Sequence, residues 1–157
     1  MEKYKKKYLL FGVIVFCGVL LDQIIKFFAR TRLDLNKPMP IIGDFLRLTY
    51  LQNRGAGFGI LHDKILFIMF VSVIVLAIMF LYLDRIIALN MTVAVALLFA
   101  GVLGNLIDRL VLGFVVDYID ITYWAVFNMA DILITVGSII LIWQVYKQER
   151  KSVRSKK

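Results

Sequence analysis

Residues 101–131 read Gly-Val-Leu-Gly-Asn-Leu-Ile-Asp-Arg-Leu-Val-Leu-Gly-Phe-Val-Val-Asp-Tyr-Ile-Asp-Ile-Thr-Tyr-Trp-Ala-Val-Phe-Asn-Met-Ala-Asp, and a long apolar run follows them. The stretch holds several carboxylate and amide side chains among residues that are mostly apolar. Such side chains are expensive to bury in a membrane, so their presence beside apolar segments indicates a functional site. Two of them, Asp117 and Asp131, are the candidates for a catalytic pair.

The composition is typical of an integral membrane protein. Hydrophobic residues make up 61% of the 157 residues, and the mean hydropathy is +0.84, whereas ordinary soluble domains are roughly half apolar. Much of the formal net charge of +8 comes from lysines and arginines at the two ends of the chain. Basic residues there are typical of termini on the cytoplasmic side, where anionic lipid attracts them. Membrane lipid is therefore an expected partner, and nucleic acid is not.

Four apolar runs predict four transmembrane helices within a single polytopic domain, residues 1–157. The helices are expected at about residues 8–29, 65–83, 86–107 and 126–146. The intervening segments, about 30–64 and 108–125, are expected on the extracytoplasmic side, and a very short turn at Asp84 and Arg85 in the cytoplasm. Four crossings place both basic termini in the cytoplasm and gather the polar residues at the outer face.

The two outer segments show extended rather than helical patterns. Pro38, Pro40 and Gly43 exclude one continuous helix in the first segment, and residues 45–52 alternate between apolar and polar side chains. Residues 114–121 are rich in β-branched and aromatic side chains. A small β-rich structure is therefore predicted at the outer end of the helices.

Polar residues within the predicted helices recur at helical spacing. Asp22 and Lys26 are four residues apart and share one helix face, so they form either a local ion pair, with the Lys26 ammonium reaching the membrane interface, or a brace for a polar site at the outer membrane boundary. Asn105, Asp108 and Arg109 can likewise face one side of the third helix. They belong either to the site or to an interfacial cap in which Asp108 pairs with Arg109.

The chain offers few of the residues that bind metals or act as catalytic bases. His62 is the only histidine and Cys17 the only cysteine, so the usual nitrogen and sulfur ligand sets cannot be assembled. A catalytic triad built on a more central histidine is excluded as well. No metal and no cofactor is therefore expected.

Five short motifs occur in order along the chain. They are Asp22-Gln-x-x-Lys26, Asn53-x-Gly-x-Gly-Phe58, Gly101-x-x-Gly-Asn-x-x-Asp-Arg109, Val116-Asp-Tyr-Ile119 and Phe127-Asn-x-Ala-Asp131. In this order, at predicted membrane boundaries, the motifs resemble those of the lipoprotein signal peptidases, the bacterial signal peptidase II family. The resemblance covers the whole chain between its basic ends. It departs from the family pattern at Gly57, where alanine is more usual, and at Tyr118, where phenylalanine is more usual.

The resemblance implies a membrane α-helical fold with four transmembrane helices and a small extracytoplasmic β-rich cradle. It also implies an aspartic endopeptidase of the bacterial cytoplasmic membrane, which cleaves diacylglyceryl-modified prolipoproteins just before the lipidated cysteine. A monomer is expected, although no sequence pattern encodes the oligomeric state. Asp117 and Asp131 would be catalytic, and Asp22 and Lys26 would lie at a substrate-facing rim. The residues expected to bind substrate or brace the site are Asp22, Lys26, Asn53, Gly55, Gly104, Asn105, Asp108, Arg109, Asn128 and Ala130.

The chemistry of such a pair follows from its charges. Ionising both of two neighbouring carboxyl groups is unfavourable because the two negative charges repel each other. The pair therefore shares one proton and titrates as a unit. The ionised member draws a proton from the attacking water, while the protonated member hydrogen-bonds the scissile carbonyl and later helps protonate the leaving amine. The sequence leaves open which aspartate is the base. Because side chains of a strand alternate faces, only one of Asp117 and Asp120 is expected to face Asp131.

Three other functions fit parts of the pattern. A small proton- or cation-coupled transporter would also carry intramembrane carboxylates, but the polar residues gather at one face and are almost absent from the inner halves of the second and third spans. A structural subunit would use the same cluster to hold helices together. A serine and lysine protease is disfavoured because Ser72 and Ser138 lie deep within spans, far from Lys26 and Lys64.

Overall fold

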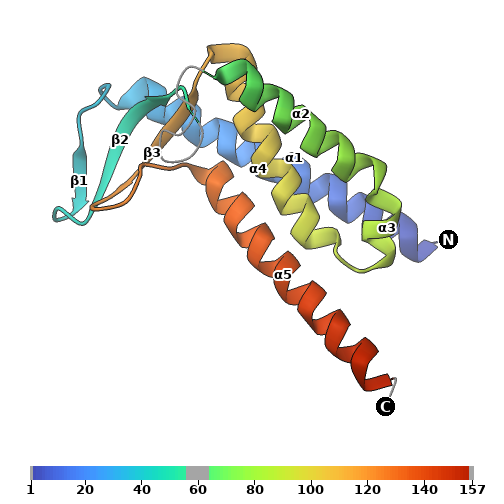
Figure 1. Ribbon diagram of the computed structural model, residues 1–157. Helices are drawn as coiled ribbons and strands as arrows, with labels where there is room; N and C mark the ends of the chain where they lie inside the picture. Colours follow the sequence, from blue (N-terminus) through green and yellow to red (C-terminus); the bar gives the residue numbers. More distant parts are fainter. Residues whose placement is uncertain (1, 56–63, 156–157) are drawn as a thin grey trace.

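The computed structural model describes residues 2–55 and 64–155, which form five helices and three strands (Figure 1). The helices are α1 (Glu2–Arg32), α2 (Ile65–Leu81), α3 (Leu83–Ala88), α4 (Thr92–Leu112) and α5 (Met129–Ser155). The strands are β1 (Met39–Ile42), β2 (Leu46–Asn53) and β3 (Val115–Ile121), and they form one small sheet at one end of the helices. Apolar helices with a small sheet are the coarse architecture that the sequence predicts.

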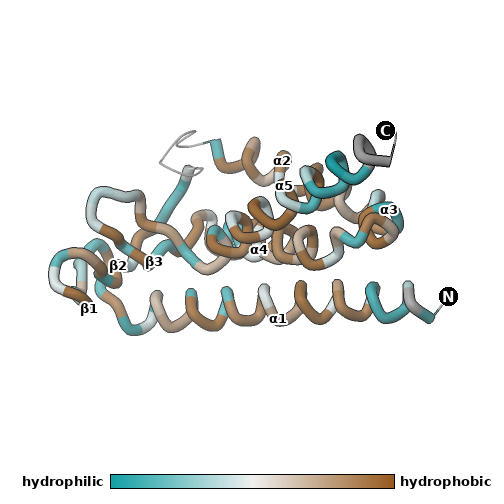
Figure 2. Tube along the Cα trace, turned by 90° about the horizontal axis from the view of Figure 1, so that it is seen from below, coloured by the Kyte–Doolittle hydropathy of each residue, from teal (hydrophilic) through white to brown (hydrophobic). Residues whose placement is uncertain are grey.

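Three helices of the described part are long and apolar enough to cross a membrane, namely Tyr4–Arg32, Thr92–Leu112 and Met129–Lys151. α2 is uncharged but has only 17 residues, which span about 26 Å, whereas the hydrocarbon core of a bilayer is about 30 Å thick. The fourth crossing therefore stays a prediction. Figure 2 shows apolar residues along these helices and hydrophilic residues at the N-terminal end of α1 and the C-terminal end of α5.

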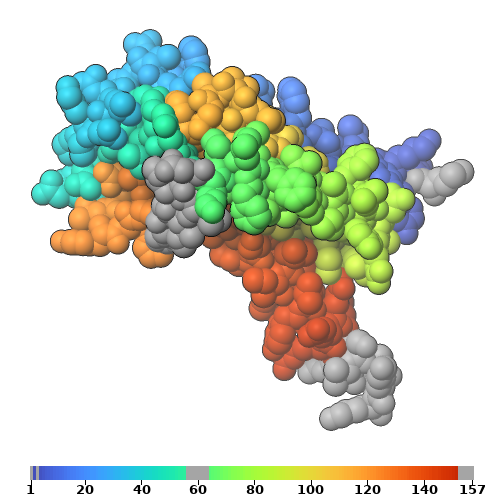
Figure 3. All heavy atoms as spheres, turned by 45° about the horizontal axis from the view of Figure 1, so that its top comes forward, coloured from blue at the N-terminus to red at the C-terminus, as the bar shows by residue number. Residues whose placement is uncertain are grey.

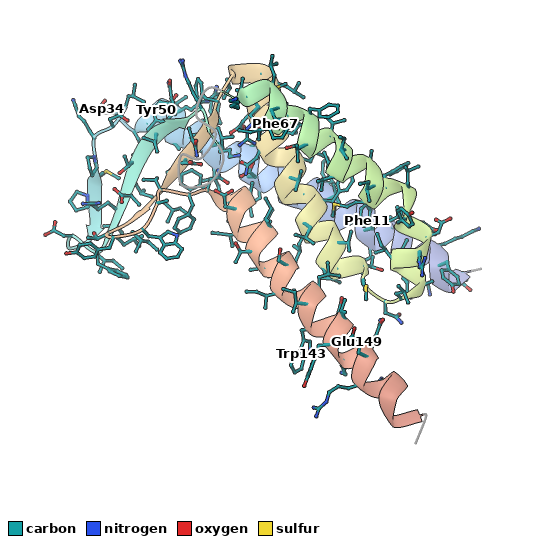
Figure 4. The ribbon with its side chains drawn as sticks, viewed as in Figure 1. Phe11, Asp34, Tyr50, Phe67, Trp143 and Glu149 are labelled. Atoms are coloured by element: carbon teal, nitrogen blue, oxygen red, sulfur yellow. The ribbon has the colours of Figure 1, made fainter. Side chains whose placement is uncertain are left out.

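α4 lies at the centre of the helices, where it packs against α1, α2 and α5. Its buried face is built from small residues, among them Ala96, Ala100 and Gly101. A side chain at Gly101 would collide with the backbone oxygen of Ala130, so this glycine lets α5 approach closely at its first turn. At its other end α5 extends past the remaining helices (Figure 3), and the exposed side chain of Trp143 points away from them (Figure 4).

The turn between α2 and α4 is not where the sequence predicts it. Asp84 and Arg85 lie within the short helix α3, and the chain reverses at residues 89–91. Asn90 has a φ of 59° there, a left-handed conformation that asparagine tolerates better than most residues. The following helix begins at Thr92 rather than directly after the predicted turn. The sequence pattern does not reveal the reversal at residues 89–91, because hydropathy carries no information about backbone conformation.

The sheet is antiparallel, with β2 between β1 and β3. β2 and β3 confirm the two extended stretches that the sequence predicts. In β2, Leu48 pairs with Ile119 and Leu51 pairs with Asp117. Thr49 and Tyr50 therefore lie together opposite the single residue Tyr118. This extra residue is a β-bulge, a feature that redirects the side chains beyond it.

The connection from α4 into the sheet is short. Gly113 ends α4 with a φ of 80°, a conformation open to glycine, and its N–H bonds the backbone oxygen of Arg109. β3 begins two residues later and packs against α1 through a buried cluster of Ala29, Val116 and Tyr118. The polar residues at the end of α4 are thereby brought beside β3 and the start of α5.

Candidate active site

Asp117 and Asp131 come from different elements and meet at the sheet end of the helices. Asp117 lies in the middle of β3 and is 1% exposed, and Asp131 lies in the first turn of α5. Both line a cavity of about 480 Å³. The other polar residues of the lining include Asn53, Asn105 and Arg109, and the apolar part comes mainly from residues 124–127 and from α5.

Asn128 joins the two aspartates. Its side-chain Nδ2 donates to Asp117 Oδ1 at 2.6 Å, and its backbone N donates to Asp131 Oδ2 at 3.1 Å. Its Oδ1 in turn accepts from the backbone N of Asp131 at 3.1 Å. The last two bonds form a capping box, which fixes the first turn of the helix. The residue that orients Asp131 is therefore the one that touches Asp117.

Two further asparagines bind the remaining carboxylate oxygens. Asn53 Nδ2 donates to Asp117 Oδ2 at 2.9 Å, and Asn105 Nδ2 donates to Asp131 Oδ1 at 2.9 Å. Each oxygen of the two aspartates thus accepts a hydrogen bond from an asparagine. These bonds fix the plane of both carboxyl groups before any ligand is bound.

Asn53 reaches Asp117 because of the bulge in β2. In a regular strand Asn53 would share a face with Arg47, six residues earlier, because side chains alternate with a period of two. The extra residue reverses that alternation, so Asn53 faces Asp117 whereas Arg47 lies opposite Asp120 on the other face. Arg47 and Asp120 form an ion pair at 2.9 Å, and Asp120 is outside the cavity lining.

The electrostatic surroundings of Asp117 favour its protonated form. Burial raises the pKa of the Asp117 carboxyl from 3.8 to about 7, against the opposing effect of the hydrogen bond from Asn53. The charge of Asp131 raises this pKa as well, whereas the Asn128 hydrogen bond and the charge of Lys26 lower it. A carboxyl group with a pKa near neutral pH can act as a proton donor under physiological conditions.

Arg109 contributes hydrogen-bond donors to the cavity. Its Nη1 donates to the backbone oxygen of Asn105 and its Nη2 to that of Gly55, both at 3.2 Å. Its Nε is buried and has no hydrogen-bond partner within the described residues. A planar guanidinium with an unused donor can bind a carbonyl or ester oxygen of a ligand.

A buried charge cluster centred on Lys26 adjoins the aspartates through Asn105. Lys26 Nζ is 2.9 Å from Asp22 Oδ2 and 3.1 Å from Asp108 Oδ2, and it donates to Asn105 Oδ1 at 2.9 Å. The ion pair of Asp22 and Lys26, one of the two alternatives, is present, but Lys26 does not reach the membrane interface. Their expected place at a substrate-facing rim is wrong, because both side chains are at most 2% exposed. The alternative pairing of Asp108 with Arg109 is also wrong, because Asp108 pairs with Lys26.

The N-terminus of α5 is fully capped by side chains. A helix leaves its first four N–H groups without partners inside the helix. Two of these groups in α5 belong to the capping box, and the other two bond to neighbouring elements. Met129 N donates to Tyr118 Oη at 3.1 Å, and Ala130 N donates to Asp22 Oδ1 at 2.9 Å. Sequence reasoning missed this role of Tyr118, which depends on β3 meeting the end of a helix.

Gln23 and Gly104 complete the cluster around Lys26. Gln23 Nε2 donates to Asp108 Oδ1 at 3.0 Å and to Asp22 Oδ2 at 3.2 Å. Sequence reasoning did not select Gln23, although it stands inside the first motif. A Cβ at Gly104 would lie 2.6 Å from Asp22 Oδ2, so only glycine lets α4 approach this carboxylate.

Comparison with known proteins connects this geometry to a family. Residues 14–147 match the family model described as Signal peptidase (SPase) II. The chain belongs to the signal peptidase II family. It is 38% identical over 139 residues to the lipoprotein signal peptidase of Halothermothrix orenii, covering 88% of this chain and 96% of that one. It is 46% identical over 134 residues to the lipoprotein signal peptidase of Caldanaerobacter subterraneus, covering 82% and 90%. A solved bacterial membrane enzyme is similar with a TM-score of 0.83 and 34% identity, covering 89% of each chain.

Membership of the signal peptidase II family makes the protein a peptidase and accounts for the order of the five motifs. All predicted site residues lie within the described part of the chain, whereas Gly57, Phe58 and His62 lie outside it. Within the described part, no group of three or more histidine, cysteine, aspartate or glutamate residues could hold a metal ion.

Proposed function

We propose that this signal peptidase II is an aspartic endopeptidase that cleaves diacylglyceryl-modified prolipoproteins just before the lipidated cysteine. The observation that carries the proposal is the pairing of Asp117 and Asp131, which line one cavity and are both bonded to Asn128. The relatives named lipoprotein signal peptidase support a prolipoprotein as the substrate. Family membership also favours hydrolysis over the alternative of ion-coupled transport.

The roles of the two aspartates follow from their surroundings. Below neutral pH, Asp117 holds the shared proton, because its pKa is raised to about 7. Asp117 then donates a hydrogen bond to the scissile carbonyl, and the Asp131 carboxylate takes a proton from the attacking water. After attack, the proton gained by Asp131 passes to the leaving amine. Because the aspartates are coupled, the pH profile reports the pair rather than either residue alone.

The shape and chemistry of the cavity suit a peptide that carries acyl chains. Its lining continues along α5 through Ile132 and Val136, away from the sheet, and Val136 is exposed. Acyl chains can lie against this apolar wall while the peptide passes between the aspartates. Arg109 can bind carbonyl or ester oxygens at the polar end of the cavity. Asp22, Lys26, Asn53, Gly55, Gly104, Asn105, Asp108, Asn128 and Ala130 are proposed to brace the site.

The proposed location is the bacterial cytoplasmic membrane, with α1, α2, α4 and α5 crossing it. The sheet and the cavity lie at one end of the helices, and the basic N-terminus lies at the other, where Lys7 donates to Ile87 O at 2.9 Å and Tyr8 to Asp84 at 2.5 Å. Both termini would then be cytoplasmic and the active site extracytoplasmic. The enzyme would act as a monomer in contact with membrane lipid and without a cofactor.

The proposal is tested by cleavage of a diacylglyceryl-modified prolipoprotein peptide by purified full-length protein in detergent. Asp117→Asn and Asp131→Asn should each reduce kcat by at least about 10²–10⁴-fold, because neither amide can exchange the catalytic proton. Asp120→Asn is the matched control on the other face of β3 and should retain substantial activity. Release of the signal peptide by wild-type protein also separates a peptidase from a transporter or a structural subunit.

Two results would contradict the assignment. Activity in Asp117→Asn together with loss of activity in Asp120→Asn would move the catalytic role to the other face of the strand. Loss of activity in all three variants, in protein that still inserts and accumulates, would show that the Asp120 face also takes part in the reaction.

A further inference from the structure

Lys26 is linked to each proposed catalytic aspartate indirectly, through one carboxylate and one backbone N–H group. Its two carboxylate partners each bind a backbone N–H group elsewhere in the chain. Asp22 Oδ1 accepts from Ala130 N at 2.9 Å, and Asp108 Oδ2 accepts from Val116 N at 3.0 Å. Ala130 directly precedes Asp131, and Val116 directly precedes Asp117. The buried Lys26 ammonium therefore forms ion pairs with two carboxylates. Each carboxylate accepts a hydrogen bond from the backbone N–H group that precedes one proposed catalytic aspartate.

We propose that Lys26 is a positioning residue that sets the spacing of Asp117 and Asp131. Through Asp22 it fixes the first turn of α5, and through Asp108 it fixes the start of β3. It touches neither catalytic carboxylate and takes no part in proton transfer. This role rests on the aspartic dyad proposed above.

All three N–H groups of the Lys26 ammonium are used. Besides Asp22 and Asp108, the third acceptor is Asn105 Oδ1 at 2.9 Å. An amide whose oxygen faces an ammonium must turn its NH₂ group the other way. Asn105 Nδ2 accordingly donates to Asp131 Oδ1 at 2.9 Å. Lys26 thus fixes both the backbone before Asp131 and the orientation of a side chain that binds its carboxylate.

The cluster needs its cation because it contains more negative than positive charge. One ammonium and two carboxylates, at most 2% exposed, carry a formal net charge of −1 in a buried site. Removing the lysine would leave Asp22 and Asp108 as neighbouring buried carboxylates, which repel each other and lose their shared partner. The two backbone segments that they hold would then be free to separate.

The direct test is Lys26→Met, which keeps an unbranched side chain only one atom shorter and removes its charge. With the diacylglyceryl-modified peptide as substrate, kcat should fall at least about 10-fold and KM should change less than about threefold, since a misplacement of about 1 Å can cost about 10²-fold in rate. Lys37→Met is the matched control. It removes the lysine of an exposed ion pair with Asp34 and should leave both constants unchanged.

The pH profile supplies a readout that loss of stability alone would not move. The charge of Lys26 lowers the pKa of Asp117, whose other charged or titratable neighbours are Asp131, Arg109 and Tyr118. Removing the cation therefore raises this pKa. The alkaline limb of the kcat profile, where Asp117 loses its proton, should move to higher pH in Lys26→Met.

Gly137→Ala is the control for destabilisation without a change in the cluster. The added Cβ would lie 2.8 Å from Ala94 O and 2.9 Å from Leu98 Cγ, so it disturbs the packing of α4 against α5. This variant should unfold at a lower temperature and keep the wild-type pH profile. A kcat loss in Lys26→Met no larger than in Gly137→Ala, with the alkaline limb in place, would overturn the positioning role.

A second variant keeps the test decisive if Lys26→Met does not accumulate. In Lys26→Met/Asp22→Asn, one positive and one negative charge are removed, so the net charge of the cluster stays at −1 and residue 22 keeps an oxygen for Ala130 N. We expect this protein to accumulate and its kcat to remain at least about 10-fold low. Wild-type kcat in this variant would overturn the proposal.

The aspartate variants test the catalytic dyad separately from the positioning role of Lys26. If Asp117→Asn and Asp131→Asn still cleave the peptide, the aspartic dyad is wrong, whatever the Lys26 variants do. If both are inactive while the accumulated Lys26 variants have wild-type kcat and pH profiles, the dyad stands and only the positioning role fails.

Discussion

Replacing Asp117 by asparagine should remove a pH dependence from the stability of the protein. The pKa of this carboxyl is about 7 in the folded chain against 3.8 ordinarily. Between these values the folded state binds a proton that the unfolded state does not, so the free energy of unfolding falls as the pH rises. The loss is about 1.4 kcal/mol per pH unit and ceases above the folded pKa. From pH 5 to pH 8 it amounts to about 2.6 kcal/mol.

The comparison of the two proteins isolates this effect. The asparagine that replaces Asp117 cannot titrate, so any hydrogen bond that it fails to make with Asn53 or Asn128 is a constant offset. The unfolding temperature of Asp117→Asn relative to wild type should therefore rise by roughly 5–10 °C between pH 5 and pH 8, at about 2–4 °C per kcal/mol for a chain of this size. Thermal unfolding in detergent micelles, followed by tryptophan fluorescence, measures this difference.

Asp120→Asn provides the control. The hydrogen bond and charge of Arg47 hold the pKa of Asp120 below its usual value. Its contribution to stability is therefore lost only as the pH falls through the acid range, and its difference from wild type should be flat from pH 5 to pH 8. A flat difference for Asp117→Asn as well would show that Asp117 does not titrate in this range, and the proposed proton donor would be refuted.

Three further outcomes are expected. Reporter fusions after Val153 and at Asp84 should report the cytoplasm and fusions within residues 38–44 the outside; a cytoplasmic signal from residues 38–44 would contradict the proposed architecture. Cleavage should survive exhaustive chelation, and a loss restored by one specific divalent metal would contradict the aspartic mechanism. Gly104→Ala, which brings a Cβ to 2.6 Å from Asp22 Oδ2, should lower kcat at least about 10-fold, whereas Gly12→Ala, with nothing within 4 Å, should not.

Sequence reasoning succeeded where a local pattern determines the structure. The ion pair of Asp22 and Lys26 follows from their spacing on one helix, and β2 and β3 follow from alternation and β-branched residues. The motif order identified the family, which the matches to Signal peptidase (SPase) II bear out. These features depend on neighbours within about eight residues or on direct comparison of short motifs.

The remaining features depend on contacts between distant segments. The burial of Lys26 could not be predicted, because it requires Asp108 from α4 and the carboxylate of Asp22 to surround the same ammonium. The bond between Tyr118 and the backbone of α5 exists only because β3 meets that helix end. The reversal at Asn90 depends on a φ value that side-chain hydropathy does not report.

Because β2 contains an extra residue, the face on which Asn53 lies depends on the number of residues in the strand rather than on which residues they are. Deleting Thr49 or Tyr50 would remove no residue of the proposed site, but it would restore regular alternation and turn Asn53 to the face of Arg47. Asp117 would then lose its hydrogen bond from Asn53, although all five motifs would still be present in the sequence. We therefore expect related enzymes to differ in length in connections such as residues 33–38, and to keep the count between Arg47 and Asn53 even when most of the intervening side chains change.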